Sequence, residues 1–476
     1  MKTRIAAGTD GTRGENVKGQ TSHRPRWGRA LFVSASAALL TLTVGCAPGA
    51  GVTQSSAPAT PKSSVNTDPA SMGNITLTVW DQEVRGGQND EIEALNAQFQ
   101  AKYPNIKIDR HAQSFDDLQK TGRLVLTGPD APDVIEANNS RSQMGSFVTA
   151  GQLVNLDPYA AAYGWRDRFP ESVLKLSSYS PDGKTFGAGS LFGLPQVGEV
   201  VGFYYNKTKL AKLNLEVPKT WADLEQQLPK IKAAGETPIV LGNLEKWPAI
   251  HVFGPIQGAH TPADEITNLA LGNPGGDWTD ATNIAAATQL QDWVKAGYFN
   301  SDVNGAAYDD VVAKFSKGTG VYFLGGSWNT ATLDPAMKDT VGFFPPPPTD
   351  ASAGPATTGG TSLPFAVTSA SKNPDAAAAY INFLTSDDAM KVIADKGNLP
   401  VLHASELAPA SGVGKDVYAA YELVTTKGHL LPYLDYATPT FSDTLGAALQ
   451  DLIAAKKTPQ EFGAALQKDY GNFIKG

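Results

Sequence analysis

The chain has 476 residues, with 39 Lys and Arg against 47 Asp and Glu, so its formal net charge is −8. Apolar residues make up 41% of it, which excludes wholesale disorder, and the acidic balance argues against a nucleic-acid-binding surface. The single Cys excludes an intramolecular disulfide and a Cys-based zinc site, and the six His show no HExxH spacing. We therefore expect neither a metal site nor a cofactor.

The first 45 residues differ from the rest of the chain. They contain seven cations and two anions, and an apolar run from Ala30 to Val44 leads into Gly45 and Cys46. A basic segment, 15 apolar residues and a small residue are typical of a secretory signal peptide, whereas a membrane-spanning helix needs about 20 residues. We predict that residues 1–45 are a signal peptide, and its removal changes the net charge to −8 − 5 = −13.

The only cysteine directly follows this run. Residues 42–46 resemble the lipobox of bacterial lipoproteins, which implies that Cys46 is lipidated and becomes the N-terminal residue, although Thr43 stands where Leu or Val is usual. The alternative is a plain secreted protein with a free cysteine. Twenty of the 27 residues from 47 to 73 are Gly, Ala, Ser, Thr or Pro, so we predict that residues 46–73 form a disordered tether.

From residue 74 onward, strand-like and helix-like segments alternate. Apolar periodicity and capping residues predict, in chain order, a strand at 74–80, a helix at 89–103, a strand at 106–109, a helix at 115–126 and a strand at 133–136. This alternation indicates parallel strands with helices on both faces of a sheet.

A second α/β block follows Gly193. The expected elements are strand 198–205, helix 220–231, strand 238–241, helices 281–296 and 306–317, strand 320–324, strand 363–368, a helix at 373–397 in one or two pieces, helix 441–455 and a last helix. Thr458 and Glu461 form a capping box that opens the last helix. Four prolines, Pro345 to Pro348, predict an extended connector.

No catalytic signature stands out. The glycine-rich residues 183–193 match neither a P-loop nor a dinucleotide-binding motif, and the chain has no GxSxG nucleophile elbow. Two carboxylates facing each other across a cleft would suit a glycosidase, and the sequence leaves this option open. We expect a binding protein without catalytic residues.

Aromatic and amide side chains gather where the predicted strands end. In an open α/β sheet the ligand lies beyond the carboxyl ends of the strands, so these residues are expected to converge on one crevice. Indole rings against C–H faces, with amides bonding hydroxyls, would suit a neutral sugar. Trp221 and Trp293 lie in helical patterns and are expected to pack in the core. The ligand-binding candidates found in this way are Trp80, Asp81, Gln82, Asn138, Asn139, Lys246, Trp247, Trp328 and Asn329. Trp278, in a glycine-rich loop, is a further candidate.

Taken in order, several segments resemble the extracellular solute-binding proteins of family 1, the sugar-binding lipoproteins of ABC importers. The most specific stretch runs from Leu191 to Lys207 and continues at Val217–Trp221. Supporting matches are residues 131–135, 315–328, 359–367 and 397–400. The resemblance implies a type II periplasmic-binding-protein fold, α/β, with two discontinuous lobes joined by three hinge crossings.

The resemblance also implies boundaries and further site residues. Lobe one would comprise residues 74–201 and 361–399, and lobe two residues 202–360 and 400–476, with crossings near 199–204, 358–363 and 397–402. Ligand-binding candidates added by the resemblance are Gln196, Glu199, Thr361 and Tyr436.

The expected function is capture of a sugar, in particular an oligosaccharide, by a monomer that is anchored through Cys46 at the outer face of the cytoplasmic membrane. Its partners would be the permease subunits of an ABC transporter, with no nucleic acid. A polyamine, amino-sugar or chelate binder on the same fold is the first alternative, since a fold does not fix the ligand. An exported glycosidase is the second.

Overall fold

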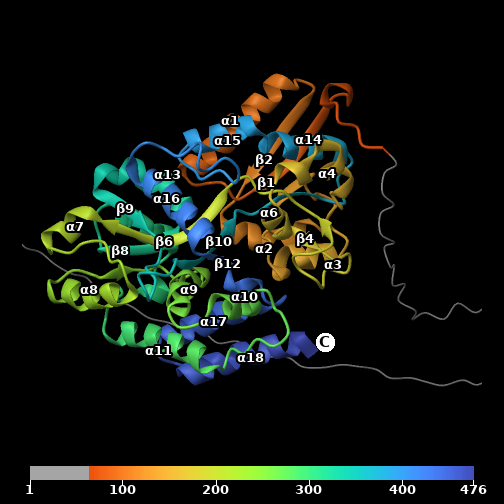
Figure 1. Ribbon diagram of the computed structural model, residues 1–476. Helices are drawn as coiled ribbons and strands as arrows, with labels where there is room; N and C mark the ends of the chain where they lie inside the picture. The colour runs from red at the N-terminus through yellow and green to blue at the C-terminus, as the bar shows by residue number, and fades with distance from the viewer. Residues whose placement is uncertain (1–63, 476) are drawn as a thin grey trace, which may run out of the picture. The chain divides into compact units, whose positions relative to one another are not determined.

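The computed structural model of the protein describes residues 64–475 (Figure 1). These residues belong to one compact unit, Ser56–Gly476. The predicted signal peptide over 1–45, the lipidation of Cys46 and the tether as far as residue 63 lie outside the described residues. No helix in the described part of the chain is both long and apolar enough to cross a membrane.

The ordered body begins earlier in the chain than predicted. Residues Pro69–Ser71 form the short 3-10 helix η1. Val65 and Met72 pack against an apolar core that also contains residues of the first sheet. The prediction of a disordered tether is therefore wrong for residues 64–73, because these apolar side chains find a surface to bury against.

The first sheet has four strands, β1 (Ile75–Asp81), β2 (Ile106–Ala112), β3 (Val134–Glu136) and β11 (Phe365–Val367). Their order is β11–β3–β1–β2, with β1 parallel to β2 and β3 and with β11 antiparallel to β3. Leu77 and Val79 are fully buried while Thr76 is exposed, which is the alternation that predicted β1. β11 comes from a distant part of the sequence, so the chain leaves this sheet and returns to it.

Helices pack on this sheet as the strand–helix alternation predicted. The elements around it are α1 (Gly86–Lys102), α2 (Phe115–Val125), η2 (Arg141–Gly145), α3 (Ser146–Thr149), α4 (Asp157–Tyr163), α5 (Trp165–Arg168), α6 (Glu171–Lys175), β4 (Ser178–Tyr179), β5 (Ser190–Leu191), α14 (Pro374–Leu384) and α15 (Asp387–Asp395). Phe99 of α1 packs edge-on against Tyr380 of α14, with 5.3 Å between ring centroids. The predicted helix at 373–397 is two helices, and the Ser386 side chain caps the second by accepting from the Ala389 amide.

The second sheet has six strands. They are β6 (Gly198–Asn206), β7 (Ile239–Val240), β8 (Tyr322–Gly326), β9 (Val341–Phe344), β10 (Ala356–Thr361) and β12 (His429–Leu431). The order is β12–β10–β6–β8–β7, and β9 pairs with β6 as well. β6 is antiparallel to its three partners, whereas β7–β8 and β10–β12 are parallel pairs. Pro345–Pro348 lies in the connection between β9 and β10, and both of these strands belong to the second sheet.

Helices and 3-10 turns surround the second sheet (Figure 1). They are α7 (Lys207–Lys212), α8 (Trp221–Ala233), η3 (Trp247–Ala249), α9 (Ile250–Gly258), α10 (Ala263–Ala270), α11 (Ala281–Lys295), η4 (Val303–Gly305), α12 (Tyr308–Ser316), η5 (Ser327–Asn329), α13 (Thr330–Met337), η6 (Lys338–Thr340), α16 (Gly412–Lys427), η7 (Leu434–Tyr436), α17 (Phe441–Ile453) and α18 (Pro459–Lys475). Trp221 and Trp293 stack at 5.7 Å in the core, which confirms their predicted packing role.

Three chain segments lie side by side between the two sheets. Gly359 pairs with Val200 where β10 meets β6, and the Gly198 amide donates a hydrogen bond to the Leu399 carbonyl at 2.8 Å. A side chain at Gly359 would approach the Glu199 carbonyl to 2.4 Å, so the close pairing requires glycine there. The chain therefore passes between two lobes, each with its own sheet, along three adjacent crossings. The exact lobe boundaries remain a prediction.

Candidate functional site

A pocket lies between the two lobes. Eight of the predicted ligand-binding residues line it, namely Gln82, Asn138, Asn139, Glu199, Trp247, Trp328, Thr361 and Tyr436. They come from both lobes and from the crossings, so the ends of strands in two separate sheets converge on one cavity. Its volume is about 90 Å³.

Sequence reasoning missed seven residues of the lining. These are Gln88, Phe115, Ile250, His251, Leu363, Tyr433 and Asp435. Most of them lie on helices or turns rather than at the ends of the predicted strands, so the strand-end rule could not select them. Trp247 and His251 are four residues apart on η3 and α9, a spacing that places them on one helical face and gave a usable signal.

Aromatic rings of the second lobe form one wall of the pocket. Trp247 lies 6.5 Å from Trp328 and 5.5 Å from His251, measured between ring centroids. The His251 ring is in turn 5.2 Å from Trp328 and 5.5 Å from Tyr433, which lies 5.7 Å from Tyr436. Five rings from different parts of the chain thus form a continuous surface that can stack on a flat apolar face of a ligand.

Trp328 is held in place from behind. Its Nε1 donates a hydrogen bond to the Tyr308 hydroxyl at 2.9 Å, and Asn329 Nδ2 donates to the same hydroxyl at 2.7 Å. Gly326 leaves room for the indole, because a Cβ at that position would meet the Trp328 ring at 1.9 Å. Asn329 is 1% exposed and does not line the pocket, so the structure places this predicted ligand residue behind Trp328.

Glu199 lies at the start of β6, where the chain crosses between the lobes. The Tyr433 hydroxyl donates a hydrogen bond to Glu199 Oε2 at 2.7 Å. Burial raises the pKa of Glu199 to about 8, although the bond from Tyr433 acts in the opposite direction. Burial therefore favours the protonated form of this carboxyl group.

The first lobe contributes amide groups opposite the aromatic wall. Asn138 and Asn139 follow β3, as the strand-end rule predicted. The Tyr436 hydroxyl donates to Asn139 Oδ1 at 3.0 Å, a hydrogen bond that joins the two lobes. Asn139 is 1% exposed, while Asn138 is half-buried and more accessible to a ligand.

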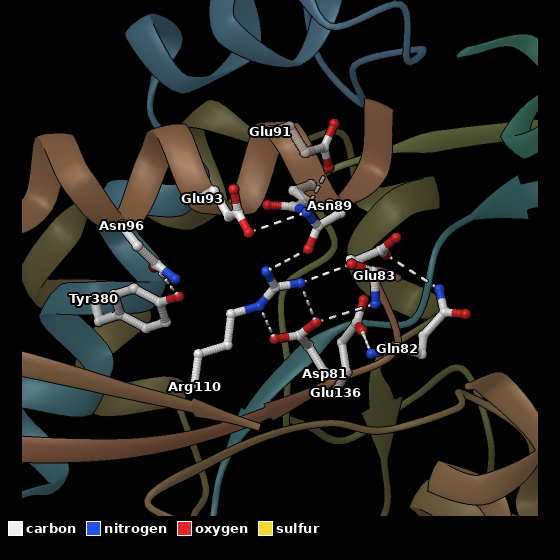
Figure 2. Close-up of polar contacts among 11 residues, drawn as sticks. Asp81, Gln82, Glu83, Asn89, Glu91, Glu93, Asn96, Arg110, Glu136 and Tyr380 are labelled. Carbon is white, nitrogen blue, oxygen red and sulfur yellow. Dashed lines mark hydrogen bonds and ion pairs between the residues drawn. The ribbon is translucent and has the colours of Figure 1, made fainter. Parts of the chain in front are cut away.

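Trp80 and Asp81 directly precede the pocket-lining Gln82 in the chain, but neither of them lines the pocket. Figure 2 shows Arg110 reaching Asp81 in a bidentate pair, with Nε and Nη2 at 2.7 and 2.8 Å from the carboxylate oxygens. Asp81 is fully buried on the same face of β1 as Leu77 and Val79, and Trp80 on the other face packs against a second core. Both predicted ligand residues are occupied by contacts inside the first lobe.

More carboxyl groups surround this pair (Figure 2). The backbone amide of Gln82 donates to Glu136 Oε2 at 2.7 Å, and the side-chain Nε2 of Gln82 donates to Glu83 Oε1 at 3.1 Å. Burial raises the pKa of Glu83, Glu91 and Glu136, and the charge of Glu83 raises the pKa of the other two further. A network of buried carboxyl groups thus supports Gln82 from behind the pocket.

Gln196, Lys246 and Trp278 were predicted to bind ligand, and the structure places all three outside the lining. Gln196 is fully buried and donates to Glu91 Oε1 at 2.8 Å, so it connects α1 to a crossing. Lys246 is exposed. Trp278 is 1% exposed and packs on Phe441 in the core of the second lobe. Trp278 lies in a glycine-rich loop, but its indole ring packs inward against Phe441.

Arg141 of the first lobe reaches the second lobe across the cleft. It donates to the backbone carbonyls of Ala437 and Leu271 at 3.1 and 2.8 Å. Its guanidinium lies 5.0 Å from the ring of Phe473 near the C-terminus. Burial lowers the pKa of Arg141, which has no acidic partner among the described residues.

A second cross-cleft contact is an ion pair. Arg85, just before α1, pairs with Asp309 of α12 at 2.9 Å. The lobes thus touch each other on both sides of the pocket, and the small cavity corresponds to a closed arrangement. Among the described residues, no group of three or more His, Cys, Asp and Glu side chains is arranged to hold a metal ion.

Comparison with known proteins agrees with this architecture. Residues 86–391 match the family model described as bacterial extracellular solute-binding protein. Because the match covers more than half of the chain, this protein belongs to the family of bacterial extracellular solute-binding proteins.

Three similar proteins illustrate the relationship. The multiple sugar-binding protein of Streptococcus mutans is 26% identical over 310 residues, 62% of this chain and 69% of the relative. The sn-glycerol-3-phosphate-binding periplasmic protein UgpB of Shigella flexneri is 28% identical over 222 residues, 44% of this chain and 47% of the relative. The solved structure of a chitin oligosaccharide binding protein superposes on this chain with a TM-score of 0.73 at 22% identity. The match includes 85% of this chain and 100% of that protein, which shows the shared fold.

Proposed function

We propose that this protein captures a sugar in the pocket between its lobes and passes it to an ABC importer. Family membership supports a binding role, and the pocket supports a carbohydrate as the solute. The observation that carries the proposal is the aromatic wall of one lobe facing amide groups of the other. Indole rings cover the C–H faces of a sugar while amides and carboxyls bond its hydroxyls.

Unpaired polar atoms on the pocket-lining side chains support the same conclusion. Gln88 Oε1, Trp247 Nε1 and His251 Nδ1 are buried and have no hydrogen-bond partner among the described residues. Buried polar atoms normally have partners, so these three are costly to leave unpaired. Sugar hydroxyls both donate and accept hydrogen bonds, and a bound sugar would therefore satisfy all three.

The lining argues against a phosphate ester such as sn-glycerol 3-phosphate, the ligand for which the relative UgpB is named. Phosphate recognition relies on Arg, Lys or clustered backbone amides. None of the described residues that line the pocket is Lys or Arg. An uncharged or positively charged ligand fits this lining better than an anion.

Entry of the ligand requires the lobes to separate. A cavity of about 90 Å³ is smaller than the roughly 150 Å³ cavity that admits a benzene molecule, so an oligosaccharide cannot fit without opening. The three crossings would absorb the rotation while each lobe moves as a rigid body. Because the ligand touches both lobes only after closure, it shifts the population toward the closed form.

We further propose that the mature chain begins at a lipidated Cys46, which anchors the protein, as a monomer, at the outer face of the cytoplasmic membrane. Residues 46–63 would then connect this anchor to the folded body. A lipidated cysteine would hold the protein beside permease subunits in the same membrane. Replacing Cys46 by Ser should release the protein into the medium. Retention of the variant in the membrane fraction would contradict lipidation.

A thermal-shift screen of mono-, di- and trisaccharides, with sn-glycerol 3-phosphate and spermidine included, tests the sugar proposal. We expect at least one sugar to raise the melting temperature without being converted, as checked by chromatography of the sugar after incubation. Product release would favour a glycosidase, and a shift by spermidine or the phosphate ester alone would indicate another solute.

A further inference from the structure

The pocket combines carboxyl groups with aromatic rings and lacks a cation. Glu199 and Asp435 both line it, and no Lys or Arg occurs among the described lining residues. Tyr433 bonds only Glu199 Oε2, so no described residue donates to Oε1 of the same carboxyl group. One carboxyl oxygen at the crossing is therefore available to a ligand.

Burial in this pocket disfavours the ionised form of both acids. Burial raises the pKa of Glu199 to about 8 and that of Asp435 to about 6, and the charge of Glu83 adds to the effect on Glu199. His251 cannot supply a positive charge, because burial lowers its pKa to about 3 and keeps the ring neutral. Two acids that are costly to ionise in the empty pocket would both be stabilised by a bound cation.

The rings around Glu199 suit the same charge. Tyr433 bonds Glu199, and the ring centroid of His251 lies 5.5 Å from that of Tyr433 and 5.2 Å from that of Trp328. The faces of such rings carry partial negative charge and attract an ammonium group, most strongly where water is excluded.

The rim of the cleft is acidic as well. Asp116 of α2 and Glu245 of the second lobe interact across it, and burial together with Glu245 raises the pKa of Asp116 to about 6. Lys120 and Arg85 act in the opposite direction, and Arg85 is paired with Asp309. None of these acids and cations lines the pocket itself. Closure brings these like charges together, which favours a ligand that brings a positive charge with it.

We propose that the pocket selects a sugar that carries a protonated amine, and that Glu199 pairs with its ammonium group. This inference rests on the proposed function, since it names the class of sugar for the same pocket. The rings of Trp328 and Tyr433 enclose the ammonium group, and the amides of the first lobe bond the remaining hydroxyls. A neutral sugar of the same shape gains no ion pair with either acid of the pocket.

Two matched sets of sugars test this selectivity by calorimetry at pH 6.5, where sugar amines are protonated. The first set is D-glucosamine, D-glucose and N-acetyl-D-glucosamine, and the second is chitosan disaccharide, cellobiose and N,N′-diacetylchitobiose. Within a set only the C2 substituent of each sugar ring changes, from ammonium to hydroxyl or acetamide. We expect the ammonium form to bind at least tenfold more tightly than either neutral form in at least one set.

Three charge-neutralising variants identify the residue responsible. Glu199→Gln should reduce the preference for the ammonium form at least tenfold, and Asp435→Asn should reduce it to a smaller extent. Glu422→Gln removes the same charge from the exposed face of α16 and should leave the preference unchanged. Melting temperatures show whether each variant is folded, and Asp435→Asn still tests the charge argument if Glu199→Gln is unstable.

Equal or tighter binding of the neutral forms would overturn the amine proposal while leaving the sugar-binding function intact. A preference that persists in Glu199→Gln would overturn the assignment of that residue. Failure of all six probes would also overturn the amine proposal, and the broader sugar screen described above then decides the proposed function separately.

Discussion

Trp328 depends on neighbours that the ligand never touches. Tyr308 accepts hydrogen bonds from both Trp328 and Asn329, and Gly326 leaves space for the indole ring. A side chain held in this way loses little entropy when a sugar stacks on it, which favours affinity. Asn329 acts as a positioning residue even though the sequence placed it among the ligand contacts.

We predict that Trp328→Ala weakens sugar binding by about 1–3 kcal/mol, the typical loss for a buried aromatic contact residue. The loss arises because the variant removes the stacking surface at the centre of the aromatic wall. Calorimetry with a sugar found in the screen measures it, and Trp328→Phe, which keeps a ring, should lose less. An unchanged dissociation constant in Trp328→Ala would contradict the site.

Asp81 shows why position at the end of a strand does not by itself assign a ligand residue. The alternation of β1 turns its carboxylate to the buried face, where Arg110 takes it in a bidentate pair. Gln82, one residue later, faces the pocket instead. The neighbouring acids behind Gln82 then carry more negative charge than Arg110 can balance, and the structure raises the pKa values of several of them.

Glu136→Gln tests this excess of buried acid through the pH dependence of stability. Because burial raises the pKa of Glu136 above its ordinary value of 4.5, the native state binds a proton more tightly than the unfolded state does. Its contribution to stability is therefore present below pH 4.5 and is lost as pH rises from there through the raised pKa.

We expect Glu136→Gln to gain stability relative to the natural protein as the pH rises from 5 to 8. The new glutamine side chain needs no proton, and its oxygen can still accept a hydrogen bond from the backbone amide of Gln82. One unit of pKa shift corresponds to about 1.4 kcal/mol. Urea unfolding at both pH values measures the change. A stability difference between the two proteins that does not depend on pH would show that Glu136 is not titrating in this range.

Helices and strands with strong local signals were predicted well. β1, α2, α8 and α11 lie within two residues of their predicted bounds. β8 begins at Tyr322 rather than at residue 320, because Gly320 has a positive φ of 79° that belongs to the preceding turn. α16 was missed, although its buried residues Val413, Val417 and Val424 repeat at helical spacing.

The last helix allows a test of one local signal. The Glu461 amide donates to Thr458 Oγ1 at 3.2 Å, and the Thr458 amide donates to Glu461 Oε2 at 2.8 Å, so the predicted capping box is confirmed. We expect Thr458→Ala to cost about 1 kcal/mol of unfolding free energy because one amide at the start of α18 loses its partner.

Denaturant unfolding measures this loss. Thr425→Ala is the matched control, because Thr425 is exposed inside α16 and its hydroxyl bonds back only to carbonyls of the preceding turn, those of Tyr421 and Glu422. Removing that bond should leave stability unchanged or raise it slightly. Equal effects of the two variants would argue against the capping box.

The two lobes hold each other closed through contacts outside the pocket. Arg141 donates to carbonyls of Ala437 and Leu271, and Arg85 pairs with Asp309. These contacts exist only when the cleft is closed, so they set how much of the binding free energy a ligand must spend on closure.

We predict that Arg141→Ala makes the ligand-free protein more open and weakens sugar binding without changing any residue of the pocket. Hydrogen bonds to a charged group contribute about 1.5–3 kcal/mol each, and the cost of burying the guanidinium offsets part of that, so we expect a loss of roughly tenfold in affinity. Small-angle X-ray scattering should show a larger radius of gyration, and calorimetry should show the weaker binding.

Arg166→Ala is the control for Arg141, because Arg166 is half-exposed and pairs with Asp157 inside the first lobe. It should change neither the radius of gyration nor the affinity. If Arg141→Ala behaves in the same way, the cross-cleft bonds do not influence closure.

The order of elements, the amphipathic faces and several strand-end candidates were readable from the sequence, because they depend on the local repeat of apolar side chains and on turn and cap chemistry. Asn138, Trp247 and Trp328 were found in this way. Only the tertiary structure decided that the Trp278 side chain is buried in the core and that the Asp81 carboxylate pairs with Arg110. These outcomes depend on which distant segments pack together, and local periodicity carries no information about that.

The same reason explains the residues that sequence reasoning missed. His251 and Tyr433 reach the pocket from segments far apart in the chain, and neither is at the end of a predicted strand. The unpaired carboxyl oxygen of Glu199 and the absence of a cation from the described pocket lining become visible only when both lobes are assembled. The chemistry of the pocket is therefore a property of the closed tertiary structure, because each lobe supplies only part of its wall.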